Sequence, residues 1–186
     1  MSKPILAAFV TCLLLHSAVS VEKPVEFTAA QQEWIPFDQV KINGHLPLES
    51  RKEQLVKELG KPDSLVNPDM SDVCTSLQDK PFSYAYFKGS KAEVYENMAM
   101  MGNFEFAGNA HLTLTTATIT LSNKTTLVEV AKYFPKAVAA KSMMDVYQKG
   151  KYLTVHIPTS KTPTEDHWIL FFRNGKLARI DYWMPC

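Results

Sequence analysis

The sequence lacks the short motifs by which many catalytic sites are recognised. It contains no G-x-S-x-G nucleophile elbow, no H-E-x-x-H, no H-x-H and no C-x-x-C pair. These absences argue against an α/β-hydrolase serine site, against the common zinc sites and against a catalytic dithiol. Because catalytic groups can also converge from distant positions in a chain, an enzyme stays open as an alternative interpretation.

The chain also lacks an excess of charge and a second long apolar run. Lys and Arg number 20 against 19 Asp and Glu, whereas a nucleic-acid-binding surface needs a basic excess on one face. No apolar stretch of about 18 residues follows the first 20 residues, so the sequence predicts no transmembrane helix. A hydrophobic share of 46% is enough for a packed core, and disorder is not expected.

Residues 1–20 have the three parts of a secretory signal peptide. Lys3 supplies the positive charge, Ile5–Leu15 the apolar run, and Ala18-Val19-Ser20 the small residues before a cleavage site. The apolar run is too short to span a bilayer as a helix. Cys12 lies in the middle of this run, without the small preceding residue that a lipoprotein signal needs. We therefore expect a soluble mature protein, exported to the bacterial periplasm or secreted.

Cysteine is scarce, and removal of the signal would leave only Cys74 and Cys186. In an oxidising compartment two such cysteines are expected to form a disulfide. The bridge would close a loop of about 110 residues, to which the chain-entropy model assigns roughly 4–5 kcal/mol. The alternatives are a free thiol or an intermolecular bridge. A catalytic thiol is disfavoured because no histidine lies near Cys74 in the sequence.

Helix signals occur at two places in the chain. Ser50 with Glu53, and Thr126 with Glu129, each match the S/T-x-x-E capping box. Apolar residues at helical spacing follow each box, and a glycine or a proline then ends the run. The sequence therefore predicts helices at residues 50–59 and 126–134, and leaves residues 138–146 ambiguous, with a further helical turn as one interpretation.

Aromatic and β-branched runs predict strands in much of the remaining chain. The run at 111–121 alternates threonine with apolar residues, as a half-buried strand does. Asn174-Gly175 is a strong signal for a two-residue hairpin turn. The predicted strands are residues 40–42, 82–87, 91–96, 104–106, 111–121, 151–157, 167–172 and 177–183.

The two halves of the chain have the same predicted order of a strand, a helix and an aromatic-rich hairpin. This order predicts an α+β fold of two tandem helix-plus-antiparallel-meander units, which form a sheet with the helices packed on one face. The alternative is that any two helix-plus-hairpin units share such features by chance. The predicted boundaries are a signal peptide at 1–20, an extended N-terminal arm at 21–33, a first α+β unit at 34–109 and a second at 110–186.

A strand, a helix closed by Gly60-Lys61-Pro62-Asp63 and a meander with an aromatic-rich hairpin resemble the α+β unit of the SmpA/OmlA outer-membrane assembly proteins. The tandem form resembles the β-lactamase-inhibitor-protein fold, and the resemblance would cover most of residues 37–183. It implies a secreted binding module rather than an enzyme. SmpA/OmlA proteins are lipid-anchored, whereas this chain has no lipobox, so the resemblance does not extend to that anchor.

Two groups of residues suggest metal binding. His156 and His167 lie on strands that could pair, with Glu165 and Asp166 nearby, but the motif spacing of a metal site is absent. The segment Met98–Met101 offers soft thioether ligands of the kind that select Cu(I), although flexible methionines also fill gaps in a core or form an adaptable contact surface. The structural interpretation is favoured for both groups, and we predict no metal and no cofactor.

Aromatic side chains on the predicted strands support the remaining functional prediction. On an open sheet face they would anchor a partner, and in the core they would only pack. We therefore predict a protein without catalytic residues that acts through protein–protein contacts with another secreted or envelope protein, as an inhibitor, an immunity protein or an envelope-assembly factor. The alternative is a small secreted enzyme or ligand carrier with a pocket between the helices and the sheet. The candidate partner-binding residues are Tyr84, Tyr86, Tyr95, Trp168 and Tyr182.

Overall fold

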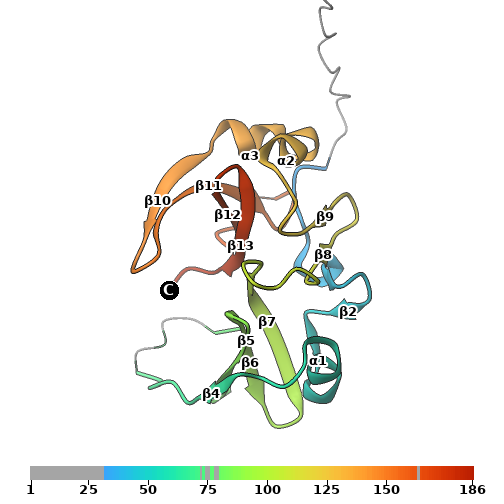
Figure 1. Cartoon of the computed structure of the whole chain (residues 1–186), viewed down its shortest axis with the longest axis vertical. Helices are drawn as coiled ribbons and strands as arrows, with labels where there is room; N and C mark the ends of the chain where they lie inside the picture. Colours follow the sequence, from blue (N-terminus) through green and yellow to red (C-terminus); the bar gives the residue numbers. More distant parts are fainter. Residues whose placement is uncertain (1–31, 72, 74–75, 78–79, 163) are drawn as a thin grey trace, which may run out of the picture.

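The structure is a computed structural model that describes residues 32–186 except 72, 74–75, 78–79 and 163. The predicted signal peptide, most of the predicted N-terminal arm and Cys74 lie outside the described residues. The described chain folds into antiparallel sheets with few helices, which confirms the α+β class (Figure 1). Among the described helices, none has the length and hydrophobicity needed to cross a membrane.

The helical elements are short. They are a 3₁₀ turn η1 (Phe37–Gln39) and the helices α1 (Lys52–Leu59), α2 (Leu127–Tyr133) and α3 (Pro135–Ala139). The strands of the first half are β1 (Lys41–Ile42), β2 (Leu46–Pro47), β3 (Glu49–Arg51), β4 (Ser64–Val66), β5 (Ser83–Phe87), β6 (Ser90–Tyr95) and β7 (Met98–Glu105). Those of the second half are β8 (Leu114–Thr115), β9 (Thr120–Leu121), β10 (Ser142–Val146), β11 (Gly150–Pro158), β12 (His167–Arg173) and β13 (Lys176–Trp183).

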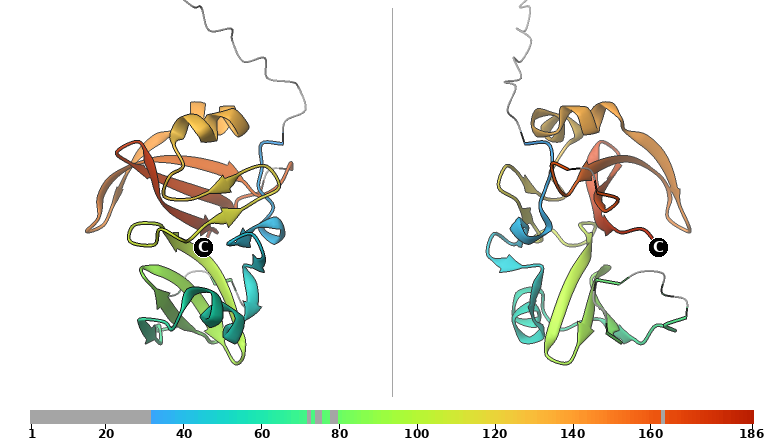
Figure 2. Two further views of the ribbon diagram at one scale, coloured as in Figure 1. Left: turned by 45° about the vertical axis from the view of Figure 1, so that its right-hand side comes forward. Right: turned by 180° about the vertical axis from the view of Figure 1, so that it is seen from behind.

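The larger sheet is one antiparallel surface in the order β10-β11-β12-β13-β7-β6-β5-β4, and β3 also pairs with β7. The smaller sheet has the order β2-β1-β8-β9. The larger sheet is bent, with β10–β13 in its upper half and β4–β7 in its lower half (Figure 1). Seen from behind, the C-terminal end of the chain lies between these two halves (Figure 2). The chain end thus lies near the place where the two halves of the sheet meet.

The main core lies on the face of the larger sheet that carries the helices and the smaller sheet. Leu55 of α1, and Val130 with Phe134 at the end of α2, belong to the same buried cluster as Met101 and Phe104 of β7. Non-polar area removed from water by this packing supplies the main driving force for folding. The helix-covered face of the sheet is thus apolar. On the other face, Tyr152, Ile169 and Phe171 of β11 and β12 form a smaller buried cluster, while β6 presents the polar residues Lys91 and Glu93.

Of the two predicted capping boxes only the second forms. The Thr126 hydroxyl accepts the Glu129 N–H at 3.2 Å, and the Glu129 carboxylate accepts the Thr126 N–H at 2.6 Å. Ser50, in contrast, belongs to β3, where pairing with β7 keeps its backbone extended. The first helix therefore begins later than predicted, with Arg51 as its N-cap and the Arg51 N–H donating to the Gln54 side chain at 3.1 Å.

The long strand predicted at 111–121 is wrong. The segment forms the short hairpin β8–β9, because the Thr116 hydroxyl accepts the N–H groups of Thr118 at 3.2 Å and Ile119 at 3.0 Å and so closes a turn. The ambiguous segment 138–146 contains the end of α3 and the edge strand β10. The predicted strands at 82–87, 151–157, 167–172 and 177–183 are confirmed within one or two residues.

The two boxes give a matched stability test. Thr126→Ala removes an N-cap acceptor and should lower the free energy of unfolding by about 1 kcal/mol. Ser50→Ala should leave the free energy of unfolding unchanged or raise it slightly, because the buried Ser50 hydroxyl has no hydrogen-bond partner among the described residues. Urea unfolding of the two variants measures the difference. Equal destabilisation by both would contradict the assigned start of α1.

Candidate functional site

A cavity of about 310 Å³ lies on the face of the larger sheet opposite the helices. Strands β5, β6, β7 and β13 contribute to its lining, together with Leu77 and the chain end at Met184 and Cys186. Lys91 and Glu93 of β6 line the cavity, whereas the alternate residues Ala92 and Val94 of this strand belong to the core cluster. The alternation of side chains along a strand thus places the cavity away from the helices. A pocket between the helices and the sheet, the alternative expected from sequence, is not where this cavity lies.

A β-bulge shapes the floor of the cavity. Lys91 lies opposite Asn103, while its neighbour Ala92 lies opposite Met101, so Gly102 of β7 is an extra residue in the ladder. A Cβ atom at Gly102 would lie 2.9 Å from the Leu77 Cδ1 atom. Glycine at this position therefore gives the Leu77 side chain room to approach the sheet closely.

Glu93 is a carboxyl group in an unusual environment. Its residue is only 7% exposed, and its Oε2 atom accepts the backbone N–H of Leu77 at 2.9 Å. Burial raises the pKa of Glu93 to about 7, although the Leu77 hydrogen bond and the charge of Lys91 oppose this rise. A carboxyl group that changes its charge near neutral pH can both accept and donate a proton, as general acid–base catalysis requires.

Lys91 is the cation next to Glu93. Its Nζ atom lies 4.1 Å from the centre of the Tyr84 ring, in a cation–π contact. Burial lowers the pKa of Lys91, and the carboxylates of Asp181 and Glu93 oppose this decrease. Burial also raises the pKa of the Tyr84 hydroxyl. The Lys91 ammonium is therefore only partly hydrated.

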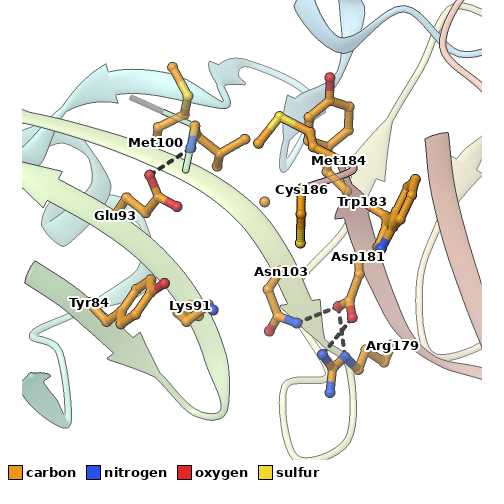
Figure 3. Close-up of a pocket in the computed structure, with 13 residues that line it drawn as sticks. Tyr84, Lys91, Glu93, Met100, Asn103, Arg179, Asp181, Trp183, Met184 and Cys186 are labelled. Carbon is orange, nitrogen blue, oxygen red and sulfur yellow. Dashed lines mark hydrogen bonds and ion pairs between the residues drawn. The ribbon is translucent and has the colours of Figure 1, made fainter. Parts of the chain in front are cut away.

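Arg179, Asp181 and Asn103 form a connected group on the opposite wall (Figure 3). The Arg179 Nε atom donates to Asp181 Oδ1 at 2.7 Å, and its Nη2 atom donates to Oδ2 at 2.5 Å. The Asn103 amide also donates to Asp181 Oδ1. Burial lowers the pKa of Arg179, but the hydrogen bonds and charge of Asp181 outweigh this effect and raise it. The bidentate pair is thus a fixed, internally neutralised part of the site.

The aromatic residues predicted to bind a partner have different environments. Tyr84 lines the cavity, and Tyr86 lies on the same strand with its ring 6.5 Å from that of Tyr84. Tyr95 lies under the Lys80 ammonium at 5.1 Å. Tyr182 also borders the cavity, but its hydroxyl donates to Asp166 at 2.6 Å. These residues do not form one open aromatic face.

Trp168 needs a correction, because it was expected as a surface contact. It is 2% exposed, its indole N–H donates to the Ile35 carbonyl at 2.8 Å, and its ring stacks on Phe37. The indole therefore ties the segment that precedes β1 to β12. A side chain with these contacts lies in the core and offers no surface to a partner.

His156 and His167 do come together, as their positions on pairing strands predicted. The His156 Nδ1 and His167 Nε2 atoms are 2.9 Å apart, and the His167 ring lies 4.7 Å from that of Trp183. Burial and the neighbouring His167 lower the pKa of His156. The Asp166 carboxylate nearby is engaged by Thr159. Within the described residues, no three His, Cys, Asp or Glu side chains lie together in a metal-binding arrangement.

The segment Met98–Met101, which suggested a copper site or a flexible filler, is part of strand β7. Alternation along the strand places Met101 on the opposite face from Met98 and Met100. Met101 is fully buried in the core cluster, whereas Met100 lines the cavity on the other face. The thioethers therefore do not converge on one point of the sheet.

Sequence reasoning missed the charged residues of the cavity. The available signal was local, since Lys91 and Glu93 alternate with Ala92 and Val94 in one strand, and Arg179 and Asp181 flank Ile180 in another. Charges at alternate positions of a strand indicate a polar face. The sequence gives no local sign that the two strands meet through β7.

Fold and cavity together define an α+β protein with a small, charged pocket on the helix-free face of an antiparallel sheet. Neither a protein-family model nor a solved structure matches the chain. Among curated proteins, the chain is 25% identical over 165 residues to a cytidine deaminase of Shewanella frigidimarina (strain NCIMB 400), a match that covers 83% of this chain and 52% of that protein. The chain spans about half the length of this relative.

This similarity corrects the predicted function. The sequence was interpreted as an inhibitor, immunity or assembly protein that acts through protein–protein contacts and has no catalytic residues. The matched relative is an enzyme, which contradicts that interpretation. The burial of Trp168 and the engagement of Tyr182 remove two of the side chains on which the interpretation depended.

The raised pKa of Glu93 has a consequence for stability. An unfolded chain ionises this carboxyl near its ordinary pKa of 4.5, whereas the folded chain does so near 7, so the folded state binds more protons in between. The free energy of unfolding should therefore fall as pH rises from 4.5 to 7, by on the order of 3 kcal/mol from this group. Glu93→Gln should remove that part of the fall, as measured by urea unfolding between pH 5 and 8. Glu53→Gln, on the exposed face of α1, serves as the control, and parallel curves for wild type and Glu93→Gln would contradict the assignment.

Proposed function

We propose that the protein is an enzyme that binds a small polar substrate in the sheet-face cavity and uses Glu93 as a general acid–base. The observation that carries this proposal is a buried carboxyl group with a pKa of about 7 at the wall of a cavity of about 310 Å³. That volume is at the small end of the range of ligand sites, which is about 300–1,000 Å³.

The other residues of the cavity have roles that follow from their contacts. Lys91, next to Glu93 on the same strand, stabilises negative charge on a bound molecule. Asp181 is held by Arg179 and Asn103, so its oxygens present a wall that does not reorganise when a substrate binds. Tyr84 and Trp183 border the same space and supply flat apolar surfaces. Proton transfer to or from a bound polar molecule is the chemistry that this arrangement supports best.

The name of the curated relative suggests cytidine as the first substrate to assay, but its mechanism cannot be transferred. Zinc deaminases hold their metal through an H-x-E and P-C-x-x-C signature. No histidine of this chain has a glutamate two residues later, and no C-x-x-C occurs. The described side chains also offer no group of three metal ligands. These residues do not fit a zinc-bound water, and we derive no step through zinc.

Purified protein assayed for release of ammonia from cytidine, and from other small amino-substituted polar compounds, tests the proposal. Glu93→Gln should lower kcat by roughly 10²–10⁴-fold with little change in KM, since a positioned acid–base contributes a factor of that size. Wild-type kcat/KM should change around pH 7. Glu53→Gln on α1 should behave as wild type. Turnover by Glu93→Gln at the wild-type rate, or no binding of any such compound by calorimetry, would remove the support for this function.

Export and the disulfide also belong to the proposal. The features of residues 1–20 support cleavage and export, and Cys186 borders the cavity. A bridge between Cys74 and Cys186 would fasten the chain end that forms one wall of the site. Mass spectrometry of protein from the exporting host should find that the chain starts at Val21. When the protein is alkylated without prior reduction, neither Cys74 nor Cys186 should carry the alkyl group. Alkylation of both thiols in unreduced protein would refute the bridge and leave the cavity in place.

We further infer that the two halves are tandem units, as the resemblance to the SmpA/OmlA and β-lactamase-inhibitor-protein folds implies. Support comes from the sheet order. Strands β4–β7 form one antiparallel meander and β10–β13 another, and each follows a helix in the sequence. The two meanders meet at their last strands, β7 and β13, so the sheet has a similar arrangement on both sides of this contact.

A further inference from the structure

The charged side chains around the cavity differ in whether they have an oppositely charged partner. Arg179 and Asp181 form a bidentate pair and neutralise each other. Glu93 has lost much of its negative charge at neutral pH. Lys91 contacts the Tyr84 ring, but no carboxylate oxygen of a described residue lies within 4.0 Å of its ammonium. Among the described residues that line the cavity, Lys91 is therefore a cation without a carboxylate partner within ion-pair distance.

Burial makes that charge costly. The lowered pKa of Lys91 means that the ammonium has lost more hydration than its neighbours restore. Tyr84 supplies only the weak attraction of a ring face. An anion bound at Lys91 would restore the missing interaction, because opposite charges attract strongly where water is partly excluded.

The surroundings of Lys91 define the rest of the ligand. Asn103 lies directly opposite it in the ladder, and the Asn103 amide N–H is directed to Asp181, which leaves the amide carbonyl as an acceptor on the cavity side. Tyr84, Met100 and Met184 line the same space. Figure 3 shows Lys91 and Tyr84 together on one wall and the sulfur atoms of Met100 and Met184 above the cavity. An anionic group at Lys91 thus has apolar and aromatic surface beside it.

We propose that the molecule bound in this cavity carries one anionic group, a carboxylate or a phosphate monoester, which binds to Lys91 and is attached to a small apolar or aromatic body. This inference rests on the proposed function, because it specifies the substrate class of the same cavity. It goes beyond that function in naming Lys91 as the group that determines specificity.

Binding of benzoate and phenyl phosphate, with benzamide as the uncharged comparison, tests the inference by NMR titration of the full chain. We expect benzoate or phenyl phosphate to shift the amide signals of Lys91, Gly102 and Asn103, and benzamide to bind at least tenfold more weakly. A response to only one of the two anions identifies the anionic group as a carboxylate or a phosphate. Affinity for the anion should fall as pH rises through 7, where Glu93 gains its charge beside Lys91, with Tyr84, Arg179 and Asp181 as the other titratable groups at the site.

Variants separate a charge effect from a structural one. Lys91→Met keeps the apolar stem and should weaken anion binding at least tenfold, whereas Lys91→Arg should keep binding within a few-fold. Lys57→Met, an exposed lysine of α1, is the matched control and should bind as wild type. If Lys91→Met does not fold, Lys91→Gln is the second variant and should weaken anion binding to a similar degree.

The outcomes also distinguish this inference from the proposed function. Anion binding that Lys91→Met does not weaken would overturn the assignment of Lys91. Turnover or binding of uncharged substrates only, with dependence on Glu93, would overturn the anionic class and leave the enzyme function standing. Absence of any small-molecule binding at the cavity would remove both.

Discussion

The pairing of β13 with β7 is the contact on which the rest of the molecule depends. It brings together residues about 80 positions apart, since Asn103 lies opposite Asp181 and Phe104 opposite Ile180. Through this pairing two separate meanders become one bent sheet, and the apolar residues of both enter one core. On the other face the same register places the Arg179–Asp181 pair beside Lys91 and Glu93. The core and the cavity are thus two results of one register.

The ionisable residues of the cavity lower the stability of the fold compared with a cavity lined by apolar residues. Lys91 is partly buried and Glu93 is buried, and their pKa values are displaced in the directions that weaken both charges. Burial of ionisable groups without full compensation is destabilising. Positions at which buried ionisable residues lower the stability of a fold in this way are most often functional sites. The displaced pKa values and the position of these two residues in a cavity therefore point to the same part of the sheet.

Much of the fold could be predicted from local patterns. The strands β11, β12 and β13 are apolar runs bounded by turn residues, and Asn174 and Gly175 adopt the positive φ values, 52° and 75°, that their hairpin requires. The capping box of α2 depends only on residues three apart. The box at Ser50 failed because its backbone pairs with β7, a partner distant in the sequence. Two equally good capping-box sequences thus had different outcomes, because at Ser50 the pairing with a distant strand competed with helix formation.

The cavity could not be predicted in the same way. Its polar residues lie on strands from both halves of the chain, and only the β7–β13 pairing brings them together. Aromatic residues attracted attention in the sequence because they dominate binding surfaces, yet Trp168 is in the core. The charged residues had a weaker signal, an alternation over four positions of β6. Long-range strand pairing and burial, which decide between these interpretations, are not written in any short stretch of sequence.

The extra residue in β7 determines which side chains the two halves present to each other. If the ladder with β6 continued regularly past Met101, Gly102 would lie opposite Lys91, Asn103 would turn toward the core and Phe104 toward the cavity. The observed order is the reverse, with Phe104 buried and Asn103 bonded to Asp181. The extra residue Gly102, within the first meander, therefore sets Phe104 toward the core and Asn103 toward Asp181 before β7 pairs regularly with β13.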